Sequence, residues 1–335
     1  MKVDELRALL DKYDAAALKE IVVALYKAIP KNRKVGDGLD ELLRDFTREK
    51  AKSSKKDKPA PVDFEELRND VEQFRAYANE QYYLAPNRHV NKDKRSKWRF
   101  EARRYIKELI SVSGENSEMA ARLLAGIYDM LSYCCHYYVF STDNPFSATG
   151  YNQVDLLNYT LEKIFYNGFG EAAVKEAVYL TLDSNTDRDT LHLQLLCTLA
   201  VALKTPETKK LALEQCAAFI KEYDSYQAKK TMFRYTEKKD YRRDRHINLA
   251  VEMCLILKFD LNEYEEGIEY FWKNYVERNK EITLYCLLTY FLSDGDLNDL
   301  WIREYEKAVR QGIKPRKILQ EEYAERKGGA PPQSA

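Results

Sequence analysis

Residues 96–111 read SKWRFEARRYIKELIS, and their pattern decides the fold class of the chain. Apolar residues recur three or four positions apart, at Trp98, Ala102, Tyr105, Ile106 and Leu109. That spacing places them on one face of an α-helix, where they can be buried together. The same spacing recurs along most of the chain. We therefore predict helix nearly throughout.

Residues that break helices are scarce. The 335 residues include only 12 glycines and 9 prolines, about half of what average composition supplies. We predict that helices end at Pro145, Gly150, Gly168, Gly170, Asn185, Pro206, residues 260–262, Asn279, Gly295 and residues 312–315. Two helices with their turns take roughly forty residues, the length of HEAT-like or TPR-like units.

We therefore expect an all-α fold of stacked antiparallel helix pairs, a HEAT-like or TPR-like right-handed α-solenoid or superhelix. The likeness is one of architecture, because the tetratricopeptide pattern is not matched at Trp98, Trp272 or Trp301. Composition divides the chain into a three-helix module at 1–49, a Lys/Ser/Pro linker at 50–62, a repeat domain at 63–327 and a disordered tail at 328–335. Asp63, with Glu66 three positions later, resembles a capping box that opens the repeat domain.

The cysteines and the apolar runs predict a compartment. None of the six cysteines belongs to a Cys-x-x-Cys pair and all lie in apolar stretches, which indicates buried free thiols in a reducing environment. Polar residues interrupt the longest apolar stretch, Leu191–Leu203, and charged residues follow Met1 directly. We expect a cytoplasmic protein without a membrane span.

Charge is balanced overall, with 54 basic and 54 acidic residues, but it is unevenly distributed. Residues 51–110 and 229–247 are basic, and most of the remainder is acidic. In the first segment Arg95, Arg99, Arg103 and Lys107 follow one another every four residues, which predicts a cationic stripe along one helix. The candidate binding residues of this segment are Tyr82, Tyr83, Arg88, Lys94, Arg95, Arg99, Arg103 and Lys107.

Such a stripe suits nucleic-acid phosphates, while Tyr82 and Tyr83 could stack on exposed bases. Two other interpretations stay open: a solvated face that pairs with nearby acidic residues, and a surface for an acidic protein. In the second basic segment the candidates are Arg234, Lys238, Arg242 and Arg245. That segment also reads as a charged connection between helices, and sequence alone does not say whether both segments share one face.

The chain carries no recognisable catalytic or metal motif. Asp183, Asn185, Asp187 and Asp189 alternate as in a calcium loop, but Arg188 occupies the position that needs glycine and the closing glutamate is missing. Cys134, Cys135 and His136 are consecutive, so a helix would point them apart, and we interpret them as core thiols beside a partly buried imidazole. The four histidines are scattered. We predict no metal, no cofactor and no identifiable catalytic residue.

Our leading hypothesis from the sequence is a non-catalytic helical repeat protein that serves as a scaffold for a protein partner. Its 25 tyrosines suit protein recognition, because tyrosine offers rigid contact area with a polar tip. The alternative is a nucleic-acid-binding protein that uses both basic segments. A third hypothesis is a hydrolase or nucleic-acid-modifying enzyme with an unrecognised site.

Overall fold

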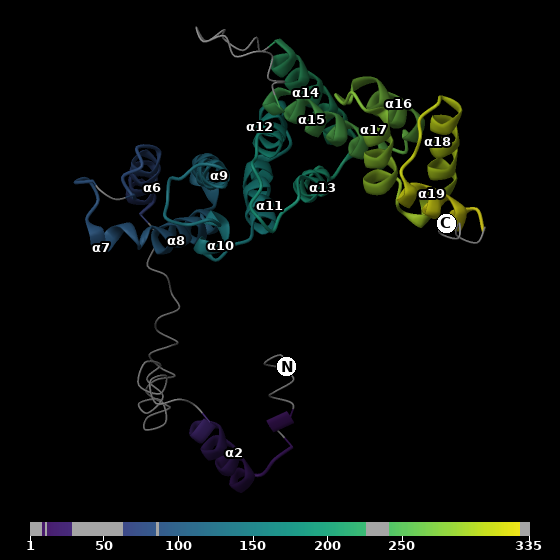
Figure 1. Cartoon of the computed structure of the whole chain (residues 1–335). Helices are drawn as coiled ribbons and strands as arrows, with labels where there is room; N and C mark the ends of the chain where they lie inside the picture. The colour runs from purple at the N-terminus through teal and green to yellow at the C-terminus, as the bar shows by residue number, and fades with distance from the viewer. Residues whose placement is uncertain (1–8, 11, 29–62, 85–86, 226–240, 329–335) are drawn as a thin grey trace. The chain divides into compact units, whose positions relative to one another are not determined.

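The computed structural model describes residues 9–10, 12–28, 63–84, 87–225 and 241–328, and these form helices with no β-strand (Figure 1). The prediction of an all-α protein is confirmed for this part of the chain. The chain divides into two compact units, Met1–Val62 and Asp63–Ala335. The expected third helix of the N-terminal module, the linker at 50–62 and most of the tail lie outside the described residues and stay predictions.

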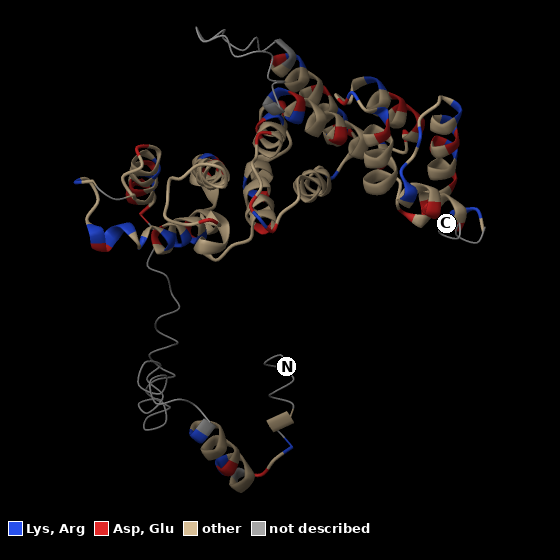
Figure 2. Ribbon diagram, in the orientation of Figure 1, with Lys and Arg blue, Asp and Glu red and all other residues tan. Residues whose placement is uncertain are grey.

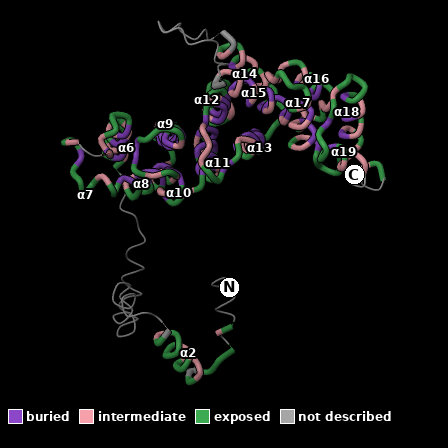
Figure 3. Tube along the Cα trace, in the orientation of Figure 1, coloured by how far each residue is buried: buried purple, intermediate pink, exposed green. Residues whose placement is uncertain are grey.

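The first unit contains helix α2, Ala15–Ala28. Asp14 caps its start, since the Ala17 N–H donates to Asp14 Oδ1 at 2.8 Å. Val22, Val23 and Leu25 are exposed on this helix, in keeping with the green trace of α2 in Figure 3. The described residues of this unit therefore bury few side chains.

The second unit holds the other described helices, and none of the helices described in either unit is long and apolar enough to span a membrane. The α-helices of the second unit are α6 (Phe64–Asn79), α7 (Lys92–Arg95), α8 (Trp98–Ser111), α9 (Ser117–Cys134), α10 (Pro145–Thr149), α11 (Gln153–Ile164), α12 (Glu171–Leu182), α13 (His192–Ala202), α14 (Pro206–Ser225), α15 (Tyr241–Asp260), α16 (Tyr264–Asn274), α17 (Lys280–Cys286), α18 (Asn298–Arg310) and α19 (Lys317–Arg326). A π-helical segment, Leu287–Phe291, continues α17. Short 3₁₀ turns occupy Gly114–Asn116, Phe165–Asn167 and Gly295–Leu297.

The first helix of this unit begins where expected and ends early. Asp63 Oδ1 accepts the Glu65 and Glu66 N–H groups at 3.0 and 3.3 Å, so the half of the predicted capping box that Asp63 supplies is confirmed. No glycine or proline occurs between Asp63 and Pro86, yet the helix ends at Asn79. Gln81 adopts φ 57°, and the Tyr82 N–H donates to the Tyr77 carbonyl, which closes the helix in a Schellman motif. No glycine marks this end in the sequence.

The expected helix over 96–111 is confirmed as α8, but it does not extend back to Arg95. A short helix, α7, ends at Arg95, and α8 starts only at Trp98. Arg95 therefore does not continue the row formed by Arg99, Arg103 and Lys107 on α8. The prediction of a cationic stripe of four residues on one helix is therefore wrong for Arg95 and holds for the other three residues.

Each helix packs mainly on helices near it in sequence. Helices α6 and α8 both pack on α9, α9 packs on α11, α11 on α13 and α12 on α14. Helix α13 then packs on α15, α14 on α15, α15 on α16 and α18 on α19. The unit is thus assembled from many packed helix pairs.

Helix α15 joins two hydrophobic cores. Leu249, Met253 and Leu257 belong to the first core, together with residues of α6 to α14. Ile247, Val251 and Leu255 belong to the second core, together with residues of α16 to α19. Each set is spaced by four and the two sets are offset by two positions, so they occupy opposite sides of the helix. This is why α15 is apolar on both faces.

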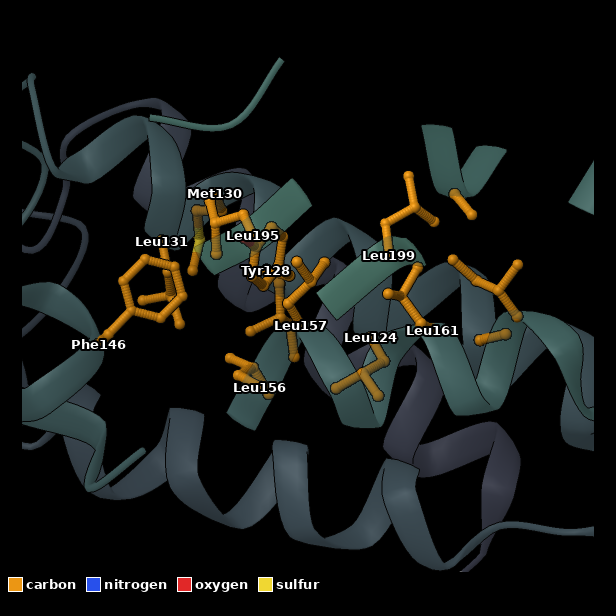
Figure 4. Close-up of a cluster of buried hydrophobic side chains, with 14 of the residues drawn as sticks. Leu124, Tyr128, Met130, Leu131, Phe146, Leu156, Leu157, Leu161, Leu195 and Leu199 are labelled. Atoms are coloured by element: carbon orange, nitrogen blue, oxygen red, sulfur yellow. The ribbon is translucent and has the colours of Figure 1, made fainter. Parts of the chain in front are cut away.

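The first core is built from leucine and aromatic side chains. Leu124, Tyr128 and Leu131 of α9 meet Leu156, Leu157 and Leu161 of α11, and Leu195 and Leu199 join them from α13 (Figure 4). The thiols follow the prediction only in part. Cys134, Cys216 and Cys254 are buried, whereas Cys135 and Cys286 are half-buried and Cys197 is exposed. The expectation of six buried thiols is wrong at these last three positions: Cys135 and Cys286 pack against the two cores while partly exposed, and Cys197 is exposed on α13.

Candidate functional site

The first basic segment is held in place by the buried face of α8. Trp98 stacks on Phe140 with ring centroids 3.9 Å apart and an angle of 10° between the rings. Ala102, Ile106 and Leu109 are fully buried in the first core. Because one face of α8 is anchored in this way, the opposite face is fixed outward.

That outer face carries cations and one aromatic ring. Arg99, Arg103 and Lys107 are exposed on α8, and so is Phe100, with 59 % of its surface accessible. The Arg99 guanidinium carbon lies 4.9 Å from the Phe100 ring centroid. Figure 2 shows Lys and Arg following one another along α7 and α8. Apart from Arg104, we call the exposed cations of this region the basic surface: Arg88, Lys92, Lys94, Lys97, Arg99, Arg103 and Lys107.

The basic surface is not neutralised by nearby acids. Within the described residues, no carboxylate lies at ion-pair distance from any of its seven cations. The neighbouring Arg104 differs, because its guanidinium bonds Asp70 at 2.9 Å and Glu108 at 3.3 Å. The interpretation of this face as one that pairs with the protein's own acids therefore applies to Arg104 alone.

Arg95 has a structural role in this region. Its Nε donates to the Val90 carbonyl at 2.8 Å and its Nη2 donates to the Asn87 carbonyl at 2.9 Å. The Asn87 side chain in turn accepts the His89 and Val90 N–H groups, both at 3.0 Å. These bonds hold the loop that carries Arg88. They also use the Arg95 guanidinium, which we had predicted to bind a ligand.

The two candidate tyrosines, Tyr82 and Tyr83, lie in different environments in the structure. Tyr83 is 7 % exposed and packs against Phe74 and Phe140, with centroid distances of 5.4 Å to each. Burial raises the pKa of its hydroxyl, and the charge of Glu101 adds to the effect. Tyr83 is thus a core residue that leaves little surface for a base to stack on. Tyr82 is half-buried and stacks on the exposed His89 ring at 4.0 Å.

The second basic segment lies largely outside the described residues, which include neither Arg234 nor Lys238 nor the side chain of Arg242. Arg245 is described on α15. Its Nη2 donates to the Ser184 carbonyl at 2.8 Å and to Asn185 Oδ1 at 3.3 Å. The part of this segment that can be placed is therefore bound to the loop between α12 and α13.

That loop is the one whose residues alternate as in a calcium site. Asn185 is bound on both backbone groups: its N–H donates to Ser132 Oγ at 2.8 Å, and its carbonyl accepts Gln153 Nε2 at 2.7 Å. Asp187 Oδ1 accepts the Asp189 N–H at 3.0 Å. Among the described residues no group of three histidine, cysteine or carboxylate side chains could hold a metal ion. Asp187 thus forms a local turn, whereas Asp183 accepts the Tyr223 hydroxyl and Asp189 Oδ2 accepts Asn144 Nδ2 at 3.0 Å.

Three histidines that are far apart in the sequence, His136, His192 and His246, interact electrostatically beside this loop. Burial, and after it the charge of Arg245, lowers the pKa of His192 to about 4, with smaller contributions from His136 and His246. His136 is exposed rather than partly buried, and α9 ends before it, at Cys134. Sequence spacing gave no signal of this interaction, because His192 and His246 lie on α13 and α15, which pack against each other in the fold, while His136 follows α9.

A small hollow of about 310 Å³ opens next to His136, lined by Cys134, Cys135, His136, Tyr137, Tyr138, Thr142, Asp143, Thr186, Asp187 and Arg188. Tyr133 and Tyr137 stack at 4.3 Å close to this hollow. Tyr133, Tyr137 and Tyr138 are at least half exposed, at 50, 51 and 70 %. We call these three residues the tyrosine cluster.

Comparison with known proteins identifies no relative, since no family, no curated protein and no solved structure matches this chain.

Proposed function

We propose that this protein is a helical binding protein that holds single-stranded nucleic acid on the basic surface of α7 and α8. The observation that carries the proposal is the absence, within the described residues, of any carboxylate at ion-pair distance from the seven cations of that surface. Cations without a protein partner keep their full charge available for phosphates. Phosphate neutralisation releases counterions, which supplies most of the affinity of such surfaces.

The exposed ring of Phe100 favours single strands over duplexes. Phe100 is 59 % exposed among cations, so its ring is accessible to a ligand. A base that is free of a duplex can stack on such a ring, and each stack of this kind contributes about 1–3 kcal/mol. Arg99 lies over the same ring, so a phosphate and a base of one nucleotide could be bound side by side. Sequence reasoning overlooked Phe100, although its position two residues after Trp98 already indicates the outer face.

The experiment is a fluorescence-anisotropy titration of the whole protein with a labelled single-stranded oligonucleotide over a range of salt concentrations. Arg99→Glu with Lys107→Glu should weaken binding by at least about tenfold and should lower the slope of log Kd against log salt by about 1.4, because each lost contact removes about 0.7. Phe100→Ala should weaken binding while it leaves that slope unchanged, since stacking releases no counterions.

The matched control is Lys175→Glu with Lys204→Glu, which makes the same change of charge at exposed positions on α12 and after α13. This control should retain the wild-type affinity. The proposal fails if the wild-type protein binds no single strand at low salt, or if the control weakens binding as much as the reversal on α8. Circular dichroism of each variant confirms that the helices are intact.

A protein partner is the second candidate function, and the tyrosine cluster favours it. Three tyrosines that are half exposed or more, two of them stacked, resemble the aromatic anchors of protein interfaces. The reversal of Arg99 and Lys107 separates the two candidates, because it would leave a contact through these tyrosines intact.

We further propose that the helix pairs of the second unit continue as a HEAT-like or TPR-like solenoid, a scaffold on which either ligand could be held. The succession of packed neighbours from α9 to α16 supports this arrangement. We also propose a cytoplasmic location, which the six free cysteines support because thiols stay reduced there.

A further inference from the structure

A second cationic site lies in the second unit, far in sequence from the basic surface. A hollow of about 620 Å³ lies between the start of α17 and the link from α18 to α19. Residues 278–281 form one wall, and residues 312–316 form the other. Its lining residues are Arg278, Asn279, Lys280, Glu281, Gly312, Ile313, Lys314 and Arg316.

The turn that follows α18 creates the second wall. Gly312 adopts φ 82°, its N–H donates to the Val309 carbonyl at 2.9 Å, and the Ile313 N–H donates to the Ala308 carbonyl at 3.0 Å. This is a Schellman motif, for which glycine is the preferred residue because it has no side chain to strain. The motif reverses the chain, so that residues 312–316 face the start of α17 and Arg316 reaches Glu281.

An ion pair holds the two walls together. Arg316 Nε and Nη2 donate to the two Glu281 carboxylate oxygens, each at 2.7 Å, and the Arg316 N–H donates to Oε1 at 3.2 Å. The guanidinium also lies 3.9 Å from the Tyr285 ring centroid. The pair lowers the pKa of Glu281 and raises that of Arg316. Arg316 and Glu281 thus act as a clasp that sets the width of the hollow.

The clasp leaves three cations around the hollow without an acidic partner. Arg278, Lys280 and Lys314 are exposed, and within the described residues no carboxylate lies at ion-pair distance from them. The one carboxylate in the lining, Glu281, is already engaged by Arg316. Three like charges held around one hollow repel one another, so an anion placed between them would relieve that repulsion.

We propose that this hollow binds a small oligophosphate anion through Arg278, Lys280 and Lys314. Its volume of about 620 Å³ falls within the range of roughly 300–1,000 Å³ that is typical of small-molecule sites. One phosphate group would meet only part of the lining, whereas a chain of phosphates can meet cations from both walls. No aromatic side chain lines the hollow, so the phosphates rather than a base would be recognised.

The test is isothermal titration calorimetry of the whole protein with sodium triphosphate at low salt. Lys280→Ala with Lys314→Ala should weaken binding by roughly tenfold or more, because charged hydrogen bonds to phosphate are lost. Lys175→Ala with Lys204→Ala is the matched control and should bind as the wild type does. ATP should bind about as tightly as triphosphate, and inorganic phosphate should bind more weakly.

Absence of triphosphate binding by the wild type, or unchanged binding by the Lys280/Lys314 variant with its helices intact, would overturn the proposal. The site is independent of the proposed function, and the two are tested separately. Arg99→Glu with Lys107→Glu should leave triphosphate binding unchanged, and Lys280→Ala with Lys314→Ala should leave oligonucleotide binding unchanged. If triphosphate binding instead follows the reversal on α8, the anion binds at the basic surface and the assignment to this hollow is wrong.

Discussion

Gly150 lies directly beside Arg103 of the basic surface. It ends α10 with φ 82°, a conformation that strains any residue with a Cβ atom. An added Cβ would also lie 3.0 Å from Cζ of Arg103, which is closer than ordinary contact. The absence of a side chain at Gly150 therefore lets the Arg103 guanidinium rest on this turn.

We expect Gly150→Ala to lower the free energy of unfolding by about 1 kcal/mol, because alanine resists the left-handed conformation. Urea denaturation followed by circular dichroism measures the effect. Gly170→Ala is the control: this glycine has φ −67°, and nothing lies within 4 Å of an added Cβ. Equal stability of the two variants would contradict the assignment of strain to Gly150.

The point at which a helix ends can depend on a single residue, and only some of these residues can be recognised from the sequence. Three helices of the second unit close in the same way, with Gln81, Asn262 or Gly312 at positive φ. Glycine and asparagine favour that conformation, and breaks were expected at both places. Glutamine does not favour it, so the end of α6 could not be read from the sequence.

At the start of α6, Asp63→Ala should lower the free energy of unfolding of the second unit by about 1 kcal/mol, because two N–H groups lose their acceptor. Thermal or urea denaturation reports the loss. Asp63→Ser keeps a side-chain oxygen at the same place and should preserve most of the stability. An alanine variant as stable as wild type would mean that water replaces the cap without cost.

At the scale of the whole molecule, the two hydrophobic cores belong to one unit. The buried members of both cores lie between Leu67 and Leu319, and α15 contributes to each. Loss of packing in either core would therefore destabilise the other core through α15. We expect the second unit to unfold as a cooperative body.

A shortened chain that begins at Asp63 should accordingly keep its helices and its cooperative transition, because no buried member of either core precedes Leu67 in the described residues. Circular dichroism at 222 nm and calorimetry compare it with the whole chain. A shortened chain that melts without a cooperative transition would contradict this view and would assign part of the core to residues 1–62.

Local residue patterns alone predicted the helical class, most helix breaks and the exposed row of Arg99, Arg103 and Lys107. These features depend on interactions between residues a few positions apart, which helical periodicity and turn chemistry describe well. Burial of Tyr83 and capture of Arg95 by the Asn87 loop could not be read in this way. Both depend on what a side chain meets in space: Phe74 and Phe140 for the tyrosine, two free carbonyls for the arginine.

By itself the sequence determined that this protein is helical, where charge gathers along it, and that its cysteines need not pair. Only the tertiary structure decided which cations stay without acidic partners, which histidines influence one another's charge, and that residues 278–281 and 312–316 line one hollow. The physical reason is the separation along the chain of the residues that interact in each case. Helix formation is settled within one turn, whereas a binding surface depends on side chains from distant segments and on which of their charges the fold has already paired.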